Sequence, residues 1–161
     1  MMQTENRKSN NYRIHQQMAN RLFHILTFFA ALLVSPLSIA ADIVVYKSPT
    51  CGCCNDWVEH LESNGFSVQT HDRRDMQRVK RTLDVPERLQ SCHTAVIGGY
   101  VVEGHVPAND IVRLLREKPA VKGISVPGMP MGSPGMEGPR KDNYDVLIFD
   151  EAGKTQVYSS Y

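Results

Sequence analysis

This chain of 161 residues has almost no net charge, no visible internal repeat and few cysteines. The sequence has 18 lysines and arginines against 17 aspartates and glutamates, a formal net charge of +1. A chain so close to neutral offers no basic face for nucleic acid or anionic lipid, so neither is expected as a partner. No internal repeat is visible, which excludes a repeat architecture. Only four cysteines occur, at positions 51, 53, 54 and 92.

Long apolar runs are equally rare, since the only one extends from Leu22 to Leu37. It precedes the small-residue sequence Ser38-Ile39-Ala40 and follows four basic residues, Arg7, Lys8, Arg13 and Arg21. This pattern predicts a signal peptide over residues 1–40 that is cleaved on export to the periplasm. Met18 is an alternative start of translation. An uncleaved membrane anchor is the alternative reading, and Pro36 with the small residues favours cleavage.

The predicted mature chain runs from Ala41 to Tyr161. Its 121 residues suffice for one domain with one core. The leader holds four of the 18 basic and one of the 17 acidic residues, so 14 and 16 remain and the mature net charge is −2. No further membrane span is predicted, so no membrane association is expected after cleavage.

Hydrophobic patterning predicts a βαβα unit in the first half of the mature chain. The apolar run Ile43–Tyr46 is typical of a strand buried on both faces. A helix over 53–64, a strand over 66–70 and a helix over 72–83 follow. The expected buried residues of the two helices are Trp57, Val58 and Leu61 in the first and Met76, Val79 and Leu83 in the second.

The second half continues as two strands and a helix. Strands over 94–97 and 100–102 flank Gly98-Gly99, which predicts a β-hairpin. Pro107 opens a helix that Pro119 closes, and its expected buried stripe is Ile111, Val112, Leu114 and Leu115. The order β-α-β-α-β-β-α over residues 41–120 predicts an α/β domain with thioredoxin-like topology.

Residues 121–161 form a C-terminal extension that we expect to pack on the same domain. Glycine, proline and methionine dominate residues 123–138, so this run is predicted to be neither helix nor sheet. Two short apolar runs, 146–149 and 155–158, predict a closing β-hairpin around Glu151-Ala152-Gly153. The Gly/Pro/Met loop is therefore expected to be held at both ends by folded elements.

The motif Cys51-Gly52-Cys53-Cys54 lies between the first predicted strand and helix. Cys51 and Cys54 alone have the Cys-x-x-Cys spacing of a redox couple. Cys53 is one thiol too many for that couple, and three thiols suit a soft metal equally well. A helix N-terminus favours thiolate over thiol. A purely structural disulfide is disfavoured because so short a loop stabilises little.

Cys92 and His93 lie just before the third predicted strand, beside the active-site helix of a thioredoxin-like fold. Thioredoxins have a cis-proline before that strand, whereas this chain has Thr94 and no proline nearby. Cys92 and His93 can thus add metal ligands where a redox enzyme would hold its substrate. The alternative for Cys92 is a buried, inert thiol.

Thioethers are available at Met129, Met131 and Met136, in the Gly/Pro/Met loop. This soft, neutral donor suits Cu(I) and binds zinc poorly, although the same methionines could simply pack the loop down. His105 lies at a strand end from which it could reach the cysteines, or it could cap the chain locally. His60 and His71 are expected to be surface residues without a role in the site.

Four motifs occur in order: Cys51-Gly52-Cys53-Cys54, Cys92-His93-Thr94-Ala95, Glu103-Gly104-His105-Val106-Pro107 and the loop from Pro127 to Glu137. Together they resemble the CopG-type periplasmic copper-resistance proteins. The resemblance implies a thioredoxin-like domain, a metal-binding extension and a cysteine-bridged site for several copper ions. It also implies interconversion of Cu(I) and Cu(II), with the four cysteines as bridging thiolates. His105 and the Met129–Met136 segment, called the methionine loop below, are the implied outer ligands.

Three functional hypotheses follow. The first is a redox-active, copper-binding periplasmic protein of copper resistance, a possible copper oxidoreductase whose partners are copper ions and periplasmic copper-efflux components. The second is a thiol–disulfide oxidoreductase that uses Cys51 and Cys54, with Cys53 as bystander or resolving thiol. The third is a passive copper store or chaperone.

Overall fold

The computed structural model describes residues 42–161 as one folded unit. The predicted signal peptide, residues 1–40, lies outside the described residues. Within residues 42–161, no helix combines the length and apolar character needed to cross a membrane.

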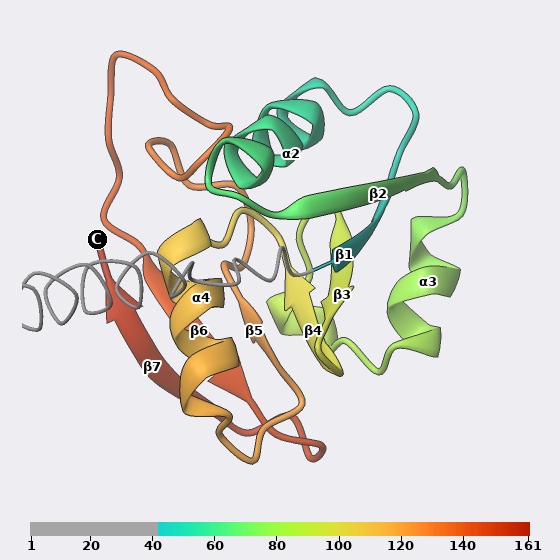
Figure 1. The fold of residues 1–161 in the computed structure, drawn as a ribbon, viewed down its shortest axis with the longest axis vertical. Coiled ribbons are helices and arrows are strands. Elements are labelled where there is room, and N and C mark those ends of the chain that lie inside the picture. Colours follow the sequence, from blue (N-terminus) through green and yellow to red (C-terminus); the bar gives the residue numbers. More distant parts are fainter. Residues whose placement is uncertain (1–41) are drawn as a thin grey trace, which may run out of the picture. The chain divides into compact units, whose positions relative to one another are not determined.

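A mixed seven-stranded sheet in the order β2-β1-β3-β4-β5-β6-β7 forms the centre of this unit (Figure 1). The pairs β1–β2 and β4–β5 are parallel, and the other four neighbouring pairs are antiparallel. The α/β class predicted from the sequence is confirmed. The strands are β1 (Asp42–Lys47), β2 (Ser67–Asp72), β3 (Thr94–Ile97), β4 (Tyr100–Glu103), β5 (Gly123–Ser125), β6 (Asp145–Phe149) and β7 (Thr155–Ser160).

Three α-helices and one short 3₁₀ helix connect the strands. They are α2 (Gly52–Ser63), α3 (Met76–Thr82), the 3₁₀ helix η1 (Glu87–Leu89) and α4 (Ala108–Glu117). The two-glycine turn predicted between β3 and β4 is present, with φ of 56° at Gly98 and 86° at Gly99. Such positive φ values are strained for other residues and explain why glycine occupies both positions.

Helices α2 and α4 cover one face of the sheet. The cross-strand row Val45, Ala95, Val102 and Ile124 points to this face, where it shares the main core with Trp57 and Leu61 of α2 and Ile111 and Leu114 of α4. Trp57 is fully buried, and its indole N–H donates to the Val106 carbonyl over 2.9 Å. Burying a large apolar side chain contributes about 1.5–3 kcal/mol.

The opposite face has a second, smaller core. Val85, Leu89, Val101 and Phe149 form it, and Tyr46 of this face borders α3. The row Tyr46, Thr94, Glu103 and Ser125 crosses this face from strand to strand. Its last three members are buried and polar, an arrangement that requires hydrogen-bond partners.

Strand direction brings distant segments to one end of the sheet. β1 ends at Lys47 and leads to the cysteine motif, whereas the antiparallel β3 begins at Thr94, directly after Cys92 and His93. β4 runs antiparallel to β3, so it ends at this same edge and leads to His105. β5, parallel to β4, ends here too and leads into the methionine loop. Four segments carrying soft ligands therefore meet.

Two predicted elements are wrong in extent. Residues 123–125, predicted as loop, form β5, which pairs with β4 and β6. Gly123 packs so tightly against the Val101 carbonyl and the Phe149 ring that a Cβ atom would overlap both. The helix predicted over 72–83 begins only at Met76, because β2 continues to Asp72 and the Asp75 carboxylate caps the helix by accepting from the Arg78 N–H over 3.0 Å.

Three burial predictions are also corrected. β1 is not buried on both faces: Ile43 and Val45 are fully buried, and the alternate residues Val44 and Tyr46 are only half-buried. In α4, Val112 is 48% exposed because it faces away from the Ile111–Leu114 stripe. In α3, the buried side chain is Lys80, and the residues expected to be buried, Met76, Val79 and Leu83, are not.

Candidate metal centre

The cysteine motif occupies the N-terminal end of α2. Cys51 is the N-cap residue, and Cys53 and Cys54 lie in the first turn. Neither a side-chain cap nor an acidic residue satisfies the backbone N–H groups of this turn. These free donors and the helix dipole favour negative charge, so a thiolate here is stabilised.

All four cysteine sulfur atoms lie within 4.8 Å of one another. Cys51 and Cys54 form a disulfide, whereas Cys53 and Cys92 are free. The Sγ atoms of Cys51 and Cys53 are 3.6 Å apart. The structure thus unites the Cys51–Cys54 motif with Cys92, which is 38 residues further along the sequence.

Cys92 also connects the cysteines to two buried histidines. Its Sγ lies 3.1 Å from Nε2 of His105 and 3.3 Å from Nδ1 of His93. Nδ1 of His105 is 2.7 Å from the Pro134 carbonyl oxygen, which can only accept, so this nitrogen carries the proton. Nε2 of His105 therefore directs a lone pair at Cys92. A backbone carbonyl that fixes the tautomer in this way is typical of metal-binding histidines.

Burial sets the protonation of these groups. It raises the pKa of the Cys92 thiol to about 11, and the nearby Cys53 contributes to this rise. Burial lowers the pKa of His105, and burial together with His105 and Lys80 lowers the pKa of His93 well below its ordinary range. In the metal-free protein at neutral pH, Cys92 is a thiol and both imidazoles are neutral. A neutral imidazole is the form that binds metal.

His93 is fully buried and stacks on Trp57, with ring centroids 4.2 Å apart. Its Nε2 is the only buried side-chain nitrogen or oxygen among residues 42–161 that lacks a hydrogen-bond partner. An unpaired buried polar atom costs about 1–3 kcal/mol. The position of His93 beside Cys92 therefore carries a cost in stability.

The methionine loop reaches the cluster through its backbone. The Pro134 carbonyl accepts from His105, and Gly135 packs on the first turns of α2, where an added Cβ would lie 2.7 Å from the Cys53 carbonyl oxygen. Met129 is 53% exposed, and Met131 and Met136 are half-buried. The structure thus brings the loop onto the cluster without giving any of the three thioethers a hydrogen bond to it.

The expectation that His60 is a surface residue is wrong. This side chain is half-buried, and its Nε2 accepts from the Ala108 N–H over 3.1 Å at the start of α4. His71 is half-buried as well and stacks on Tyr46 with centroids 5.6 Å apart. Neither belongs to the two groups of residues that could hold a metal ion.

Sequence reasoning missed a buried ion pair behind the cluster, between Lys80 of α3 and Glu103 of β4. Burial raises the pKa of Glu103, and Lys80 and the hydrogen bonds from Thr94 and Ser91 oppose that rise. The sequence did contain a signal: Lys80 lies on the same helical stripe as Met76 and Leu83, and Glu103 ends an apolar strand. Opposite charges at two such core positions indicate a pair.

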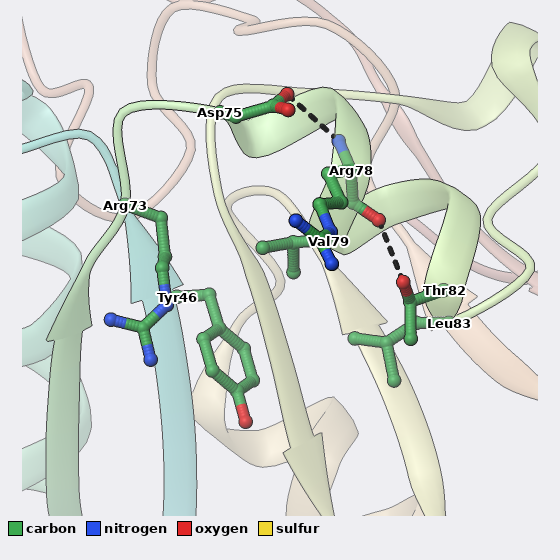
Figure 2. Close-up of a pocket in the computed structure, with 7 residues that line it drawn as sticks. All are labelled: Tyr46, Arg73, Asp75, Arg78, Val79, Thr82 and Leu83. Atoms are coloured by element: carbon green, nitrogen blue, oxygen red, sulfur yellow. Dashed lines mark hydrogen bonds between the residues drawn. The ribbon is translucent and has the colours of Figure 1, made fainter.

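A hollow of about 410 Å³ lies away from these ligands, between β1 and α3. Figure 2 shows the Arg73 guanidinium beside the Tyr46 ring, 5.7 Å from its centroid, with Arg78 on the facing helix. No cysteine or histidine lines this hollow. Among residues 42–161, the soft-ligand chemistry therefore belongs to the end of the sheet where the cysteines converge.

Fold and site together define a class: a small mixed α/β protein with a cysteine cluster able to hold a metal ion. Comparison with known proteins makes this specific. The chain is 51% identical to copper resistance protein CopG in two solved structures, form 2 and form 1. The matches cover 75% and 74% of this chain and 98% and 96% of the respective structures, with TM-scores of 0.72 and 0.71.

A family model described as a protein of unknown function, DUF411, matches residues 89–136, which include Cys92, His105 and the methionine loop. No curated protein matches. The chain belongs to the CopG copper resistance protein family, and the resemblance seen in its sequence motifs is confirmed.

Proposed function

We propose that this chain is a periplasmic copper-binding protein of copper resistance that holds several copper ions at cysteine bridges and cycles them between Cu(I) and Cu(II). The observation that supports this most directly is the convergence of four cysteine sulfurs within 4.8 Å. Thiolates are soft ligands that bind Cu(I) well, as they also bind zinc, and one thiolate can bridge two ions. The relatives at 51% identity are named copper resistance proteins.

The scaffold we propose is thioredoxin-like. The order β2-β1-β3-β4, with α2 and α4 on one face and α3 bordering the other, supports this assignment. On such a scaffold the helix N-terminus lowers the cost of placing several thiolates together. Residues 121–161 extend the sheet, and the methionine loop within them contacts His105 and the first turns of α2.

We assign the bridging role to Cys51, Cys53, Cys54 and Cys92. His105, whose tautomer is fixed by Pro134, is the best-prepared outer ligand. His93 and the methionines at 129, 131 and 136 are weaker candidates, and their thioethers would favour Cu(I). Bound copper supplies one-electron redox chemistry. The chain contributes the donors, fixes their spacing and shields the histidine side from water.

Copper stoichiometry tests this proposal. We expect the reduced mature protein to bind more than one copper per chain under anaerobic conditions. Cys92→Ser should weaken copper binding by more than the ~10–100-fold that loss of an outer-shell partner costs, since it removes a direct ligand. His71→Ala is the control and should bind like the wild type. Zinc alone, or less than one copper per chain, contradicts the proposal.

A second function is favoured by the Cys51–Cys54 disulfide. As a thiol–disulfide oxidoreductase, the reduced protein would transfer two electrons and two protons from the Cys51 and Cys54 thiols to a substrate disulfide, which becomes a dithiol while the Cys51–Cys54 disulfide forms. Cys53, 3.6 Å from Cys51, could act as the resolving thiol. Rapid insulin reduction by the reduced, metal-free protein, unchanged in Cys92→Ser, would favour this function over the first.

A passive copper store or chaperone would use the same ligands without turnover. Optical and EPR spectra of the copper-loaded protein, after an oxidant and then a reductant, separate the two. Reversible conversion of bound Cu(I) to Cu(II) without loss of metal indicates redox cycling. Release of copper on oxidation indicates storage.

Export to the periplasm and cooperation with copper-efflux components complete the proposal. The motivation is the predicted signal peptide over residues 1–40. Cell fractionation with N-terminal sequencing should find a periplasmic protein that begins at Ala41. A membrane-bound product that retains residues 22–37 would instead support the uncleaved anchor.

A further inference from the structure

Two opposite charges are completely buried next to the Cys92 segment. The Lys80 side chain is 2% exposed and that of Glu103 is 0% exposed, and the two form a close ion pair. Removing both ions from water is unfavourable, and apolar residues of similar volume often fill such a position at equal or better stability. The pair therefore needs an explanation other than stability.

The Glu103 carboxylate holds both ends of residues 91–94. Its Oε1 accepts from the Ser91 backbone N–H over 2.6 Å, and its Oε2 accepts from the Thr94 hydroxyl over 2.6 Å. Lys80 donates to the carboxylate and, over 3.0 Å, to the Thr94 hydroxyl oxygen. Cys92 and His93 are the two residues between these attachment points. One carboxylate thus fixes the backbone that presents both side chains.

The same strand end sets the position of His105. The Gly104 N–H donates to the His93 carbonyl over 3.1 Å, and a Cβ at Gly104 would lie 2.7 Å from the Ser91 Cβ. The segment that carries His105 is therefore pressed against the segment that carries Cys92. Glu103 belongs to the first segment and binds the second. It is well placed to keep Nε2 of His105 3.1 Å from the Cys92 sulfur.

We propose that Glu103, held in place by Lys80, is a positioning residue of the metal site that fixes Cys92 relative to His105 and the other three cysteines. Glu103 contacts no ligand atom in this arrangement and acts through the backbone of Ser91 and the hydroxyl of Thr94. The inference rests on the proposed copper site and names the residue pair that keeps the Cys92 sulfur close to the other three cysteine sulfurs.

Two double variants test this role, since changing one partner alone leaves an uncompensated buried charge that can prevent folding. K80M/E103L removes the pair and leaves the Ser91 N–H without an acceptor. K80M/E103Q removes the same charges but keeps an amide oxygen that can accept from Ser91. Thermal unfolding first checks that both variants fold.

We expect K80M/E103L to bind Cu(I) about 10–100-fold more weakly than the wild type in chelator competition, as is typical for loss of an outer-shell partner. K80M/E103Q should recover much of this affinity. In the Cys92→Ser background, the two double variants should bind copper equally, because the ligand that Glu103 holds in position is gone. A merely structural role would weaken copper binding in both backgrounds.

Alkylation of Cys92 in the metal-free protein, with the other three cysteines replaced by serine, gives a readout that needs no copper. Iodoacetamide should modify Cys92 faster in K80M/E103L than in K80M/E103Q. If the wild type binds no copper but this difference appears, the proposed function fails and the positioning role stands. If K80M/E103L binds copper as tightly as the wild type, and its Cys92 is alkylated at the same rate as without these two substitutions, the inference is overturned.

Discussion

Cys53 is the thiol that distinguishes this motif from a simple redox couple. In the described structure, the Cys51–Cys54 disulfide occupies two of the four converging sulfurs, and Cys53 and Cys92 stay free. A sulfur in a disulfide lacks the anionic charge that makes a thiolate a strong soft ligand. Metal binding and disulfide formation therefore compete for Cys51 and Cys54.

This competition predicts a countable change in thiols. The oxidised, metal-free mature protein should show two reactive thiols after denaturation, and the reduced protein four. Copper bound per chain should fall in the oxidised form, because half of the proposed bridging ligands are missing. Ellman titration alongside metal analysis measures both. Equal copper loading of the two forms would contradict bridging by Cys51 and Cys54.

At the scale of elements, an imidazole from one helix caps another. The N-cap residue of α4, Pro107, has no side-chain cap of its own, and His60 of α2 accepts from the Ala108 N–H instead. Burial lowers the pKa of His60, although Glu137 opposes the shift. Only the neutral ring can accept this bond, and an imidazolium would also face the positive end of the α4 dipole.

We therefore expect His60→Ala to lower the free energy of unfolding by about 1 kcal/mol at pH 7.5, as for loss of an N-cap. The pKa of His60 in the folded protein lies below its unfolded value of about 6.5, so the unfolded chain binds more protons at intermediate pH. The stabilisation by His60 is therefore fully present above the unfolded pKa and is lost as pH falls through the folded pKa. Urea unfolding at pH 7.5 and 5 should show the difference between His60→Ala and the wild type shrinking at the lower pH. A pH-independent difference would exclude the cap.

At the scale of the whole unit, contact between the methionine loop and α2 closes one side of the site. Gly135 has a φ of 80° and lies directly on the Cys53 carbonyl and the Trp57 N–H. Gly128 has a similar φ of 70°, but a Cβ atom added there would meet no heavy atom within 4 Å. The two glycines thus form a matched pair, similar in backbone strain and different in packing.

Gly128→Ala should lower the free energy of unfolding by about 1–2 kcal/mol through backbone strain alone. Gly135→Ala adds overpacking of about 1–3 kcal/mol and should push Pro134 away from His105. Urea unfolding measures the first effect, and exchange of the His105 Nδ1 proton by NMR measures the second. Equal losses in the two variants, with the His105 proton unaffected, would show that the loop does not support the site.

Much of the architecture could be predicted because it depends on local patterns. Alternating and helical periodicity located the strands and helices, and Gly98-Gly99 located a turn that requires positive φ. β5 was missed because three residues beginning with glycine show no periodicity; their pairing with β4 and β6 makes them a strand. Lys80 and Glu103 were missed because each charge is tolerable in the core only beside the other.

The donors can be read from the amino-acid sequence: four thiols, several imidazoles and a methionine loop favour a soft metal, because ligand type is a local chemical property. Which of these donors meet depends on the tertiary fold. Cys92 and His105 reach the Cys51–Cys54 motif because β3 is antiparallel to β1 and β4, so strand ends distant in sequence share one edge. His60 was directed instead to α4, where the end of a neighbouring helix lacked a cap.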